Sequence, residues 1–372
     1  MSAGIYLHIP FCRSRCSYCD FATDVFKSEA AVERYVSALA KEIENFSQPN
    51  AEVETIYLGG GTPSLLTPRQ LEKILDIIHR KFRVRRENEF TMEMNPATVT
   101  PETLKSYKSL GVNRASFGAQ TFDDTELKRL GRHHTANDVR ETIKLLRDAD
   151  FDNVSFDLIA GLPRQTLEDW ERNLDEALKL KPEHLSLYLL EIHEGTPLAE
   201  QIRSNRQPAP DEDSAAEMYE LMIRKTSGAG YEQYEISNFA LSGYASKHNT
   251  KYWRCEPVYA FGVSAHSFDG RFRSANERDT AKYVNLIEAN KSAEVFREET
   301  DLASEFIFLG LRLSNGINLT EYENRFGINL RKKYAIDLQR LEELELIVFA
   351  ENHLRLTRKG MVYSNEVFAV FV

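Results

Sequence analysis

The sequence predicts an α/β fold: an open, partial (β/α)6 barrel followed by a C-terminal, winged-helix-like α+β region. Strand and helix signals alternate six times in the first two hundred residues, which favours a parallel sheet covered by helices. Polar or glycine-rich residues come directly after these strands, at the end where a barrel carries its site. Six repeats rather than eight favour an open barrel, although a flat doubly wound sheet fits the periodicity almost as well.

The six expected strands lie in the stretches GIYLHIP, VETIYLGGG, FTMEMNP, RASFGAQ, VSFDLIAGLP and HLSLYLLEI. Helical spacing of apolar residues separates them, as in the stripe from Val32 to Phe46. Thr67 and Thr100 each stand before a proline, and Thr166 precedes a further apolar stripe. A threonine N-cap with proline in the first turn is a typical helix start, so we expect helices to begin at these three positions.

Changes in composition and in secondary-structure pattern along the chain predict three regions. Residues 1–210 form the barrel, and the stretch 203–215, RSNRQPAPDEDSA, is typical of a linker. Residues 211–300 form a connecting region. Residues 301–372 form the C-terminal unit, in which Asn318 and Glu321 resemble a capping box and LIVFAENHLRLT is expected to be a hairpin.

Composition excludes several classes of protein. The 372 residues carry a net charge of −10, and the third helix of the C-terminal unit mixes basic with acidic side chains, so a nucleic-acid partner is not expected. Four cysteines are too few for a secreted disulfide scaffold. The N-terminal residues have neither the basic nor the long apolar part of a signal peptide. We therefore expect a protein of the reducing cytoplasm.

Three of the four cysteines lie in one short stretch, CRSRCSYCDF, as Cys12, Cys16 and Cys19. Clustered cysteines in an intracellular chain usually bind metal or do redox work, although three unrelated thiols remain an alternative. A structural zinc site needs four ligands, normally as two separated pairs, and here a second pair is missing. Three cysteines on a [4Fe–4S] cluster leave one iron open to a small molecule.

The spacing C-x3-C-x2-C resembles the signature of the radical S-adenosylmethionine (SAM) superfamily. This resemblance implies a [4Fe–4S] cluster on Cys12, Cys16 and Cys19, with SAM at the open iron and reductive cleavage to methionine and a 5′-deoxyadenosyl radical. The glycine run 59–61 follows the second strand, where we expect its backbone amides to meet the methionine end of SAM. Glu93 ends the third strand and could accept a hydrogen bond from the SAM ammonium.

The order of motifs over nearly the whole chain resembles the family of oxygen-independent coproporphyrinogen III oxidase and its relatives. The motifs are YLHIPFC, GGGTPS, EMNP, NRASFGAQTF, LGRHH, FDLIAGLPRQT and GVSAHSF. The positions that match SAM contacts in this family are Tyr6, Tyr18, Gly60, Gly61, Thr62, Glu93, Gln120, Arg132 and Asp157. In that family some of these residues also touch a second SAM.

Two departures distinguish the chain from the oxidase pattern. Phe21 stands where the oxidase has a further cysteine, and eleven residues precede Cys12 where the oxidase has a longer extension. Both features are similar to a sister group, the HemW heme chaperones. The motif HNTKYW resembles their H-N-x-x-Y-W heme motif, which assigns heme contacts to His248, Asn249, Tyr252 and Trp253. A histidine nitrogen is a common heme ligand and aromatic rings suit a porphyrin face, whereas a lone histidine would more often lie in a surface loop.

The resemblance implies a carrier that binds heme and delivers it to heme-accepting proteins, including membrane-associated ones. It also implies an electron donor such as flavodoxin or ferredoxin. The alternatives are coproporphyrinogen III decarboxylation and another radical SAM reaction. A homodimer is an oligomeric state that the sequence leaves open.

Overall fold

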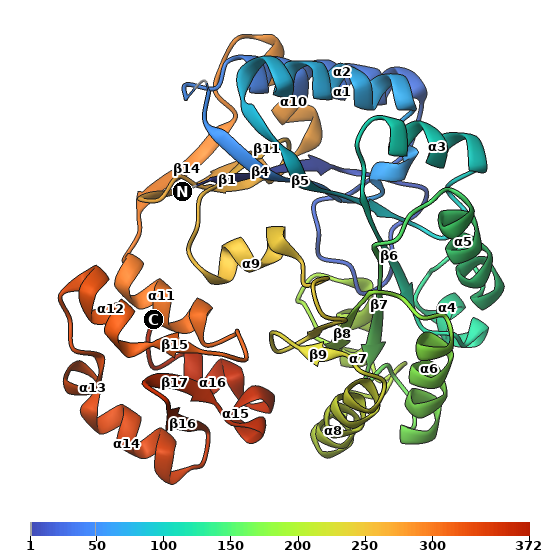
Figure 1. The fold of residues 1–372 in the computed structure, drawn as a ribbon. Coiled ribbons are helices and arrows are strands. Elements are labelled where there is room, and N and C mark those ends of the chain that lie inside the picture. Colours follow the sequence, from blue (N-terminus) through green and yellow to red (C-terminus); the bar gives the residue numbers. More distant parts are fainter. Residues whose placement is uncertain (1, 49) are drawn as a thin grey trace.

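The computed structural model describes residues 2–48 and 50–372, and within them a twelve-stranded sheet curves into an arc (Figure 1). Its centre is the parallel series β1 (Ala3–Ile9), β4 (Glu52–Gly60), β5 (Arg83–Met94), β6 (Arg114–Gln120), β7 (Val154–Ala160) and β8 (His184–Leu189). The helices α1 (Glu29–Glu44), α2 (Pro68–Lys81), α3 (Pro101–Ser109), α5 (Ala136–Asp148), α6 (Leu167–Lys179) and α8 (Glu212–Gly228) lie outside the arc. The predicted open (β/α)6 barrel is therefore confirmed, and the flat doubly wound alternative is not.

Residues 232–299 extend both edges of this sheet. On one side β11 (Val258–Phe261) pairs in parallel with β1, and the antiparallel strands β12 (His266–Phe268), β13 (Phe272–Asn276) and β14 (Glu294–Glu299) follow. On the other side β10 (Asn238–Ala240) and β9 (Glu232–Gln233) continue from β8. α10 (Thr280–Glu288) then lies against α1, where Arg34 pairs with Glu288 at 2.6 Å.

The helix starts are fixed by local chemistry, as predicted. Thr67, Thr100 and Thr166 are the N-caps of α2, α3 and α6, and each takes part in a reciprocal capping box with the third residue of its helix. Thr135 caps α5 in the same way. Each such cap stabilises its helix by about 1 kcal/mol, because it satisfies backbone N–H groups that have no partner inside the helix.

The central strands alternate between an apolar outer face and a polar inner face. On β1, Ile5, Leu7 and Ile9 are fully buried in the main core beneath the helices. Because successive side chains point to opposite faces, Tyr6 and His8 point into the barrel. The pairing registers place one row of residues side by side on β1, β4, β5 and β6: Tyr6, Tyr57, Thr91 and Arg114. A second row on β6, β7 and β8 contains Gly118, Asp157 and Ser186. The barrel interior is therefore lined with hydrogen-bonding groups.

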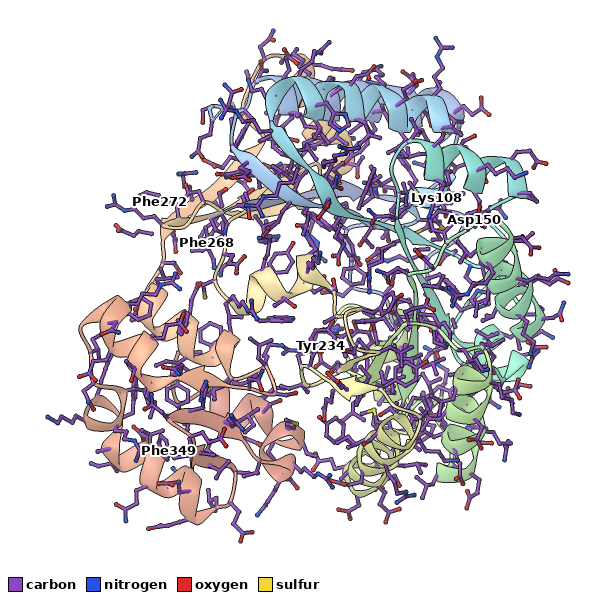
Figure 2. All side chains as sticks on the ribbon, viewed as in Figure 1. Lys108, Asp150, Tyr234, Phe268, Phe272 and Phe349 are labelled. Carbon is purple, nitrogen blue, oxygen red and sulfur yellow. The ribbon has the colours of Figure 1, made fainter. Side chains whose placement is uncertain are left out.

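A short helix, α9 (Lys247–Trp253), lies within the concave side of the arc (Figure 1). It contacts β4 and α11 (Leu302–Gly310), and it hydrogen-bonds to Thr55 of β4, to Glu89 of β5 and to the Ser2 carbonyl just before β1, away from the glycine run at the end of β4. Nearby, the Tyr234 hydroxyl (labelled in Figure 2) shares a 2.8 Å hydrogen bond with His184 of β8. α9 thus forms the floor of the barrel.

The C-terminal region has its own core and a small sheet. Its helices are α11 (Leu302–Gly310), α12 (Leu319–Phe326), α13 (Leu330–Lys333), α14 (Ala335–Glu343), α15 (Arg358–Val362) and α16 (Ser364–Phe368). Its sheet has the order β15 (Ile317–Asn318), β17 (His353–Leu356), β16 (Ile347–Ala350), so the expected hairpin is present. Asn318 caps α12 by accepting from the Glu321 amide at 2.9 Å. This arrangement confirms the winged-helix-like α+β prediction. None of the helices in the described ranges combines the length and apolar character needed to cross a membrane.

Candidate functional site

The three clustered cysteines lie on one loop at the C-terminal end of β1. Short strands β2 (Phe11–Cys12) and β3 (Asp24–Val25) pair at its base, where the Phe26 amide donates to the Cys12 carbonyl at 2.7 Å. All three thiols are half-buried and none is in a disulfide. Side chains from later strands reach this loop, because the carboxyl ends of parallel strands meet at the same end of the barrel.

Two hydrogen-bond donors point at the cysteine sulfurs. The Thr62 hydroxyl donates to Cys12 Sγ and the Arg132 guanidinium donates to Cys16 Sγ, both at 3.6 Å. Burial raises the pKa of the Cys12 thiol to about 11, so a bound cation is needed to hold it as a thiolate near neutral pH. Three clustered thiols, two of them with donors to their sulfurs, are the ligand chemistry of an iron–sulfur cluster. No set of three His, Cys, Asp or Glu side chains in the described ranges converges on a single metal ion.

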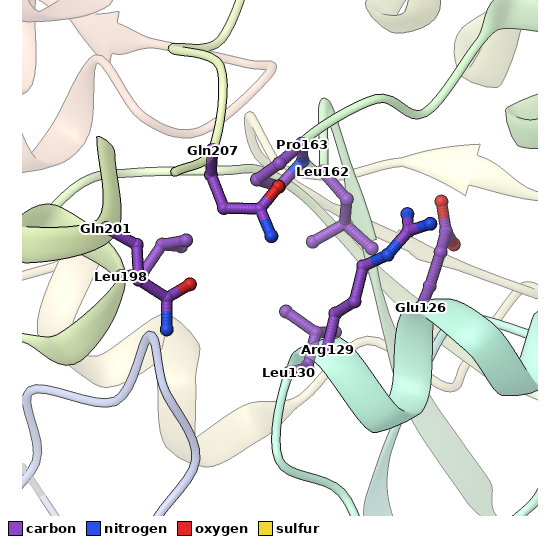
Figure 3. A pocket seen from close by; sticks show the side chains of 8 residues that line it. All are labelled: Glu126, Arg129, Leu130, Leu162, Pro163, Leu198, Gln201 and Gln207. Carbon is purple, nitrogen blue, oxygen red and sulfur yellow. The ribbon is translucent and has the colours of Figure 1, made fainter. Parts of the chain in front are cut away.

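The loop is braced from its other side by two backbone hydrogen bonds. The Ser17 amide donates to the Leu130 carbonyl after α4 (Asp124–Arg129), and the Leu198 amide of α7 (Pro197–Arg203) donates to the Ser17 carbonyl, both at 2.9 Å. Leu130 and Leu198 also line a pocket of about 280 Å³ that Figure 3 shows between these helices. Tyr18 packs beside it on Leu130 and Leu162. These contacts position the cysteine loop relative to β7 and α4.

The backbone of the glycine run packs so closely against the strand and loop that lead to the cysteines that a residue with a Cβ atom would not fit. Gly60 has φ +110°, and a Cβ there would lie 2.7 Å from the His8 ring. A Cβ on Gly61 would lie 2.7 Å from the Pro10 carbonyl carbon. The amides of residues 60, 61 and 62 donate to the Glu93 carboxylate, the Ile9 carbonyl and the Phe11 carbonyl. In this structure the run therefore serves close packing, and its amides, which we expected to face a ligand, donate within the protein.

Two acidic side chains lie in the interior beneath this end. Tyr57 donates to Glu93 Oε1 at 2.7 Å, and burial raises the pKa of that carboxyl. Burial and then the charge of Glu93 raise the pKa of Asp157 to about 7. Arg114 is 1% exposed and its charge opposes both shifts. A ligand that brings an ammonium group would find two desolvated carboxyls here as hydrogen-bond acceptors.

Other predicted SAM residues lie near these carboxyls, since the charge of Glu93 acts on Tyr6 and that of Asp157 on Tyr18. Arg132 donates to Asn95 Oδ1 at 2.9 Å and to the Gly118 carbonyl at 2.6 Å, so it links β5 to β6. Gln120 has φ +68° at the end of β6, where the pairing with β7 shifts register. The Tyr6 hydroxyl shares a 3.1 Å hydrogen bond with His8 Nδ1. An open pocket of about 470 Å³ runs past Cys16, Thr62 and Arg132.

The HNTKYW residues all lie on α9, at the opposite end of the barrel. His248 is 1% exposed and its imidazole stacks on Tyr57, with ring centroids 5.0 Å apart. Its Nδ1 shares a 2.9 Å hydrogen bond with Thr55 Oγ1, and its Nε2 shares a 3.2 Å hydrogen bond with the Tyr252 hydroxyl. Burial, followed by the charge of Lys251, lowers the pKa of His248 to about 3. Both ring nitrogens are engaged and the ring is buried, so neither nitrogen is open to a ligand in this structure.

The other motif residues point in different directions. Asn249 and Trp253 are half-buried, and Arg312 from the C-terminal region lies 4.4 Å from the Trp253 ring. The helix is held at its start by Glu89, which accepts from the Lys247 and His248 amides at 2.9 Å. At its end the Lys251 ammonium donates to the Ser2 carbonyl at 2.9 Å and pairs with Glu54 and Glu256.

Comparison with known proteins decides the family. The model of the radical SAM superfamily matches residues 6–177, and that of the HemN C-terminal domain matches residues 298–363. "Heme chaperone HemW" of Bacillus subtilis is 39% identical over 99% of this chain and 98% of its own length. "Heme chaperone HemW" of Lactococcus lactis is 35% identical over 99% and 96%. The chain belongs to the HemW family. The fold also matches the solved structure of coproporphyrinogen III oxidase (HemN) from Escherichia coli, with TM-score 0.87, 22% identity, and coverage of 100% of this chain and 90% of that one.

Several interior residues of this HemW family member were not singled out by sequence reasoning. Tyr57 and Thr55 lie in a strand that looked simply apolar, and Glu89 and Arg114 looked like ordinary strand residues. The available signal was the period-two alternation of polar residues on these strands, which marks the inner face of a barrel. That signal would have placed these four residues together without showing that α9 covers them.

Proposed function

We propose that this protein is a heme carrier that holds a [4Fe–4S] cluster on Cys12, Cys16 and Cys19, binds SAM beside the cluster, and binds heme through the α9 motif. The main support is that one barrel carries two separate groups of candidate ligand residues. Three half-buried thiols with sulfur-directed donors lie at one end, and the HNTKYW helix lies at the other. The nearly full-length relatives are named heme chaperones, which supports the proposal.

SAM would lie between the cysteine loop and the interior carboxyls. In this arrangement Glu93 and Asp157 receive the ammonium and hydroxyl groups. Gln120 borders the space from the end of β6, and Arg132 borders it from the loop after α4. Tyr6, Tyr18, Gly60, Gly61 and Thr62 complete the set proposed to surround it. When bound, the cluster supplies the electron for reductive cleavage of SAM, with flavodoxin or ferredoxin as the donor.

Heme would bind at α9 after the helix moves away from β4. Movement frees a His248 nitrogen for the iron, and Tyr252 and Trp253 offer flat rings to the porphyrin. We place the protein in the cytoplasm, handing heme to acceptor proteins that include membrane-associated ones. Heme delivery, rather than an enzymatic product, is then its output.

The rival function is coproporphyrinogen III oxidation. The similarity to the solved oxidase structure is a similarity of fold. Phe21 stands where the oxidase pattern has a further cysteine, and Phe21 is 67% exposed. An anaerobic assay with coproporphyrinogen III, SAM and a reductant separates the two. We expect no protoporphyrinogen, and steady formation of this product would replace the carrier proposal.

The decisive experiment measures cluster content and heme binding in the same preparation. We expect about four irons with sulfide per chain after anaerobic reconstitution, and loss of both in Cys16→Ala. Hemin titration should then give a defined complex whose Soret band and affinity change in His248→Ala. The matched control is His266→Ala, because His266 is an exposed histidine on β12 outside the motif. Identical hemin binding by the wild type and both histidine variants would exclude the α9 motif.

A further inference from the structure

Three aromatic rings pack together inside the barrel, between the proposed SAM residues and α9. The Tyr6 and Tyr57 rings lie with centroids 6.1 Å apart at an interplanar angle of 26°, and the Tyr57 and His248 rings lie 5.0 Å apart at 27°. The Tyr6 and His248 rings also lie 6.5 Å apart at 30°, so the three rings form one cluster. We call the stacked pair Tyr57 and His248 the aromatic column, with Tyr57 at its upper end and His248 at its lower end.

The upper end of the column is tied to the carboxyl proposed to receive the SAM ammonium. The Tyr57 hydroxyl donates to Glu93 Oε1 at 2.7 Å, and the Gly60 amide donates to Oε2 at 3.1 Å. A carboxylate with a cation beside it makes stronger hydrogen bonds to its other donors when it is held in the charged form. Bound SAM would therefore hold the Tyr57 ring more firmly in its present position.

The lower end of the column is tied to the docked state of α9. His248 stacks on Tyr57 while its two nitrogens bond to Thr55 and Tyr252. Iron ligation by His248 requires one ring nitrogen to be freed, and because the ring is 1% exposed, a heme reaches it only when α9 moves away from Tyr57 and Thr55. Anything that fixes the Tyr57 ring stabilises the docked helix and so opposes heme binding.

We propose that Tyr57 couples the two sites with a negative sign, so that SAM bound beside Glu93 weakens heme ligation by His248. The inference rests on the proposed function, because it needs both ligands. By thermodynamic linkage, heme must weaken SAM binding by the same factor. SAM binding then favours release of heme, and Tyr57 is a positioning residue that acts through His248.

The test measures hemin affinity of cluster-loaded protein with and without saturating SAM, in the absence of reductant so that SAM stays intact. We expect SAM to raise the wild-type hemin Kd about fivefold or more. Tyr57→Phe keeps the ring and removes the hydroxyl, and we expect the effect of SAM to fall below about twofold. Tyr107→Phe is the control, because the Tyr107 hydroxyl donates to the Leu66 carbonyl at 2.7 Å, away from the column. It should keep the wild-type response.

A second variant approaches the column from the other side. Thr55→Val has nearly the same shape but removes the hydroxyl bonded to His248, so it weakens docking of α9. We expect Thr55→Val to bind hemin more tightly than the wild type when SAM is absent. This result can be read even if Tyr57→Phe fails to fold. Unchanged hemin binding in Thr55→Val, a SAM effect of the opposite sign, or full coupling in Tyr57→Phe would overturn the inference while leaving the carrier proposal intact. Wild-type protein that binds no hemin would overturn both.

Discussion

Replacing Lys251 with methionine removes the charged contact that holds α9 in the barrel floor. The Lys251 side chain is 3% exposed and its ammonium meets two carboxylates and the Ser2 carbonyl. Removing one member of a fully buried ion pair costs about 3–5 kcal/mol. Here Glu54 keeps a second partner, Arg85 at 2.8 Å, and Glu256 is about one-quarter exposed and can be hydrated. We therefore expect a smaller loss, about 2 kcal/mol in the free energy of unfolding.

The assay is urea unfolding of the apo protein combined with hydrogen exchange at the α9 amides. Lys225→Met is the matched control, because Lys225 also meets two carboxylates, Glu171 at 2.7 Å and Asp175 at 2.8 Å, but its side chain is 22% exposed. Its loss should cost less than about 1 kcal/mol. Exchange should accelerate in α9 of the Lys251 variant and stay unchanged elsewhere in the barrel. Equal costs for the two variants, or unchanged exchange in α9, would refute the reasoning.

Three other predictions concern stability and the cluster end. Burial raises the pKa of the Glu42 carboxyl to about 7, so the protonated side chain stabilises the fold below about pH 4.5 and this stabilisation is lost as the pH rises to 7. In urea titrations, Glu42→Gln should therefore reduce the difference in unfolding free energy between pH 5 and pH 8 by up to about 3 kcal/mol. An unchanged pH profile would contradict this. Gly61→Ala should destabilise the apo protein by about 1–3 kcal/mol, because its Cβ meets the Pro10 carbonyl; a neutral effect in thermal unfolding would show that the loop yields. Thr62→Val should lower the cluster reduction potential at unchanged iron content, because Cys12 loses its hydroxyl donor; a potential equal to that of Thr62→Ser would argue against that role.

Features that depend on neighbouring residues could be predicted from the sequence. The caps at Thr67, Thr100 and Thr166 use residues three positions apart, and the cysteine loop is one short segment. The six strand-helix units have strong periodicity, so the open barrel followed from them. The C-terminal hairpin was recognisable for the same reason.

Long-range pairing explains what could not be predicted. Thr55 and His248 are 193 positions apart, and Lys251 and Glu54 are 197 apart, so no local pattern shows that α9 closes the barrel. The motif match identified His248 as a residue of interest but did not show that it is buried with both nitrogens engaged. The strands of residues 232–299 were missed as well, because they are two to six residues long and carry little periodic signal.

The floor of the barrel has a consequence for how such proteins diversify. The predicted cluster and SAM residues lie between positions 6 and 157, whereas the floor is made by a separate segment near position 250. Under the proposed function, substitutions in this one segment would change the heme site while leaving the cysteine loop intact. A relative with a different floor segment should therefore differ in the ligand it carries while keeping its cluster.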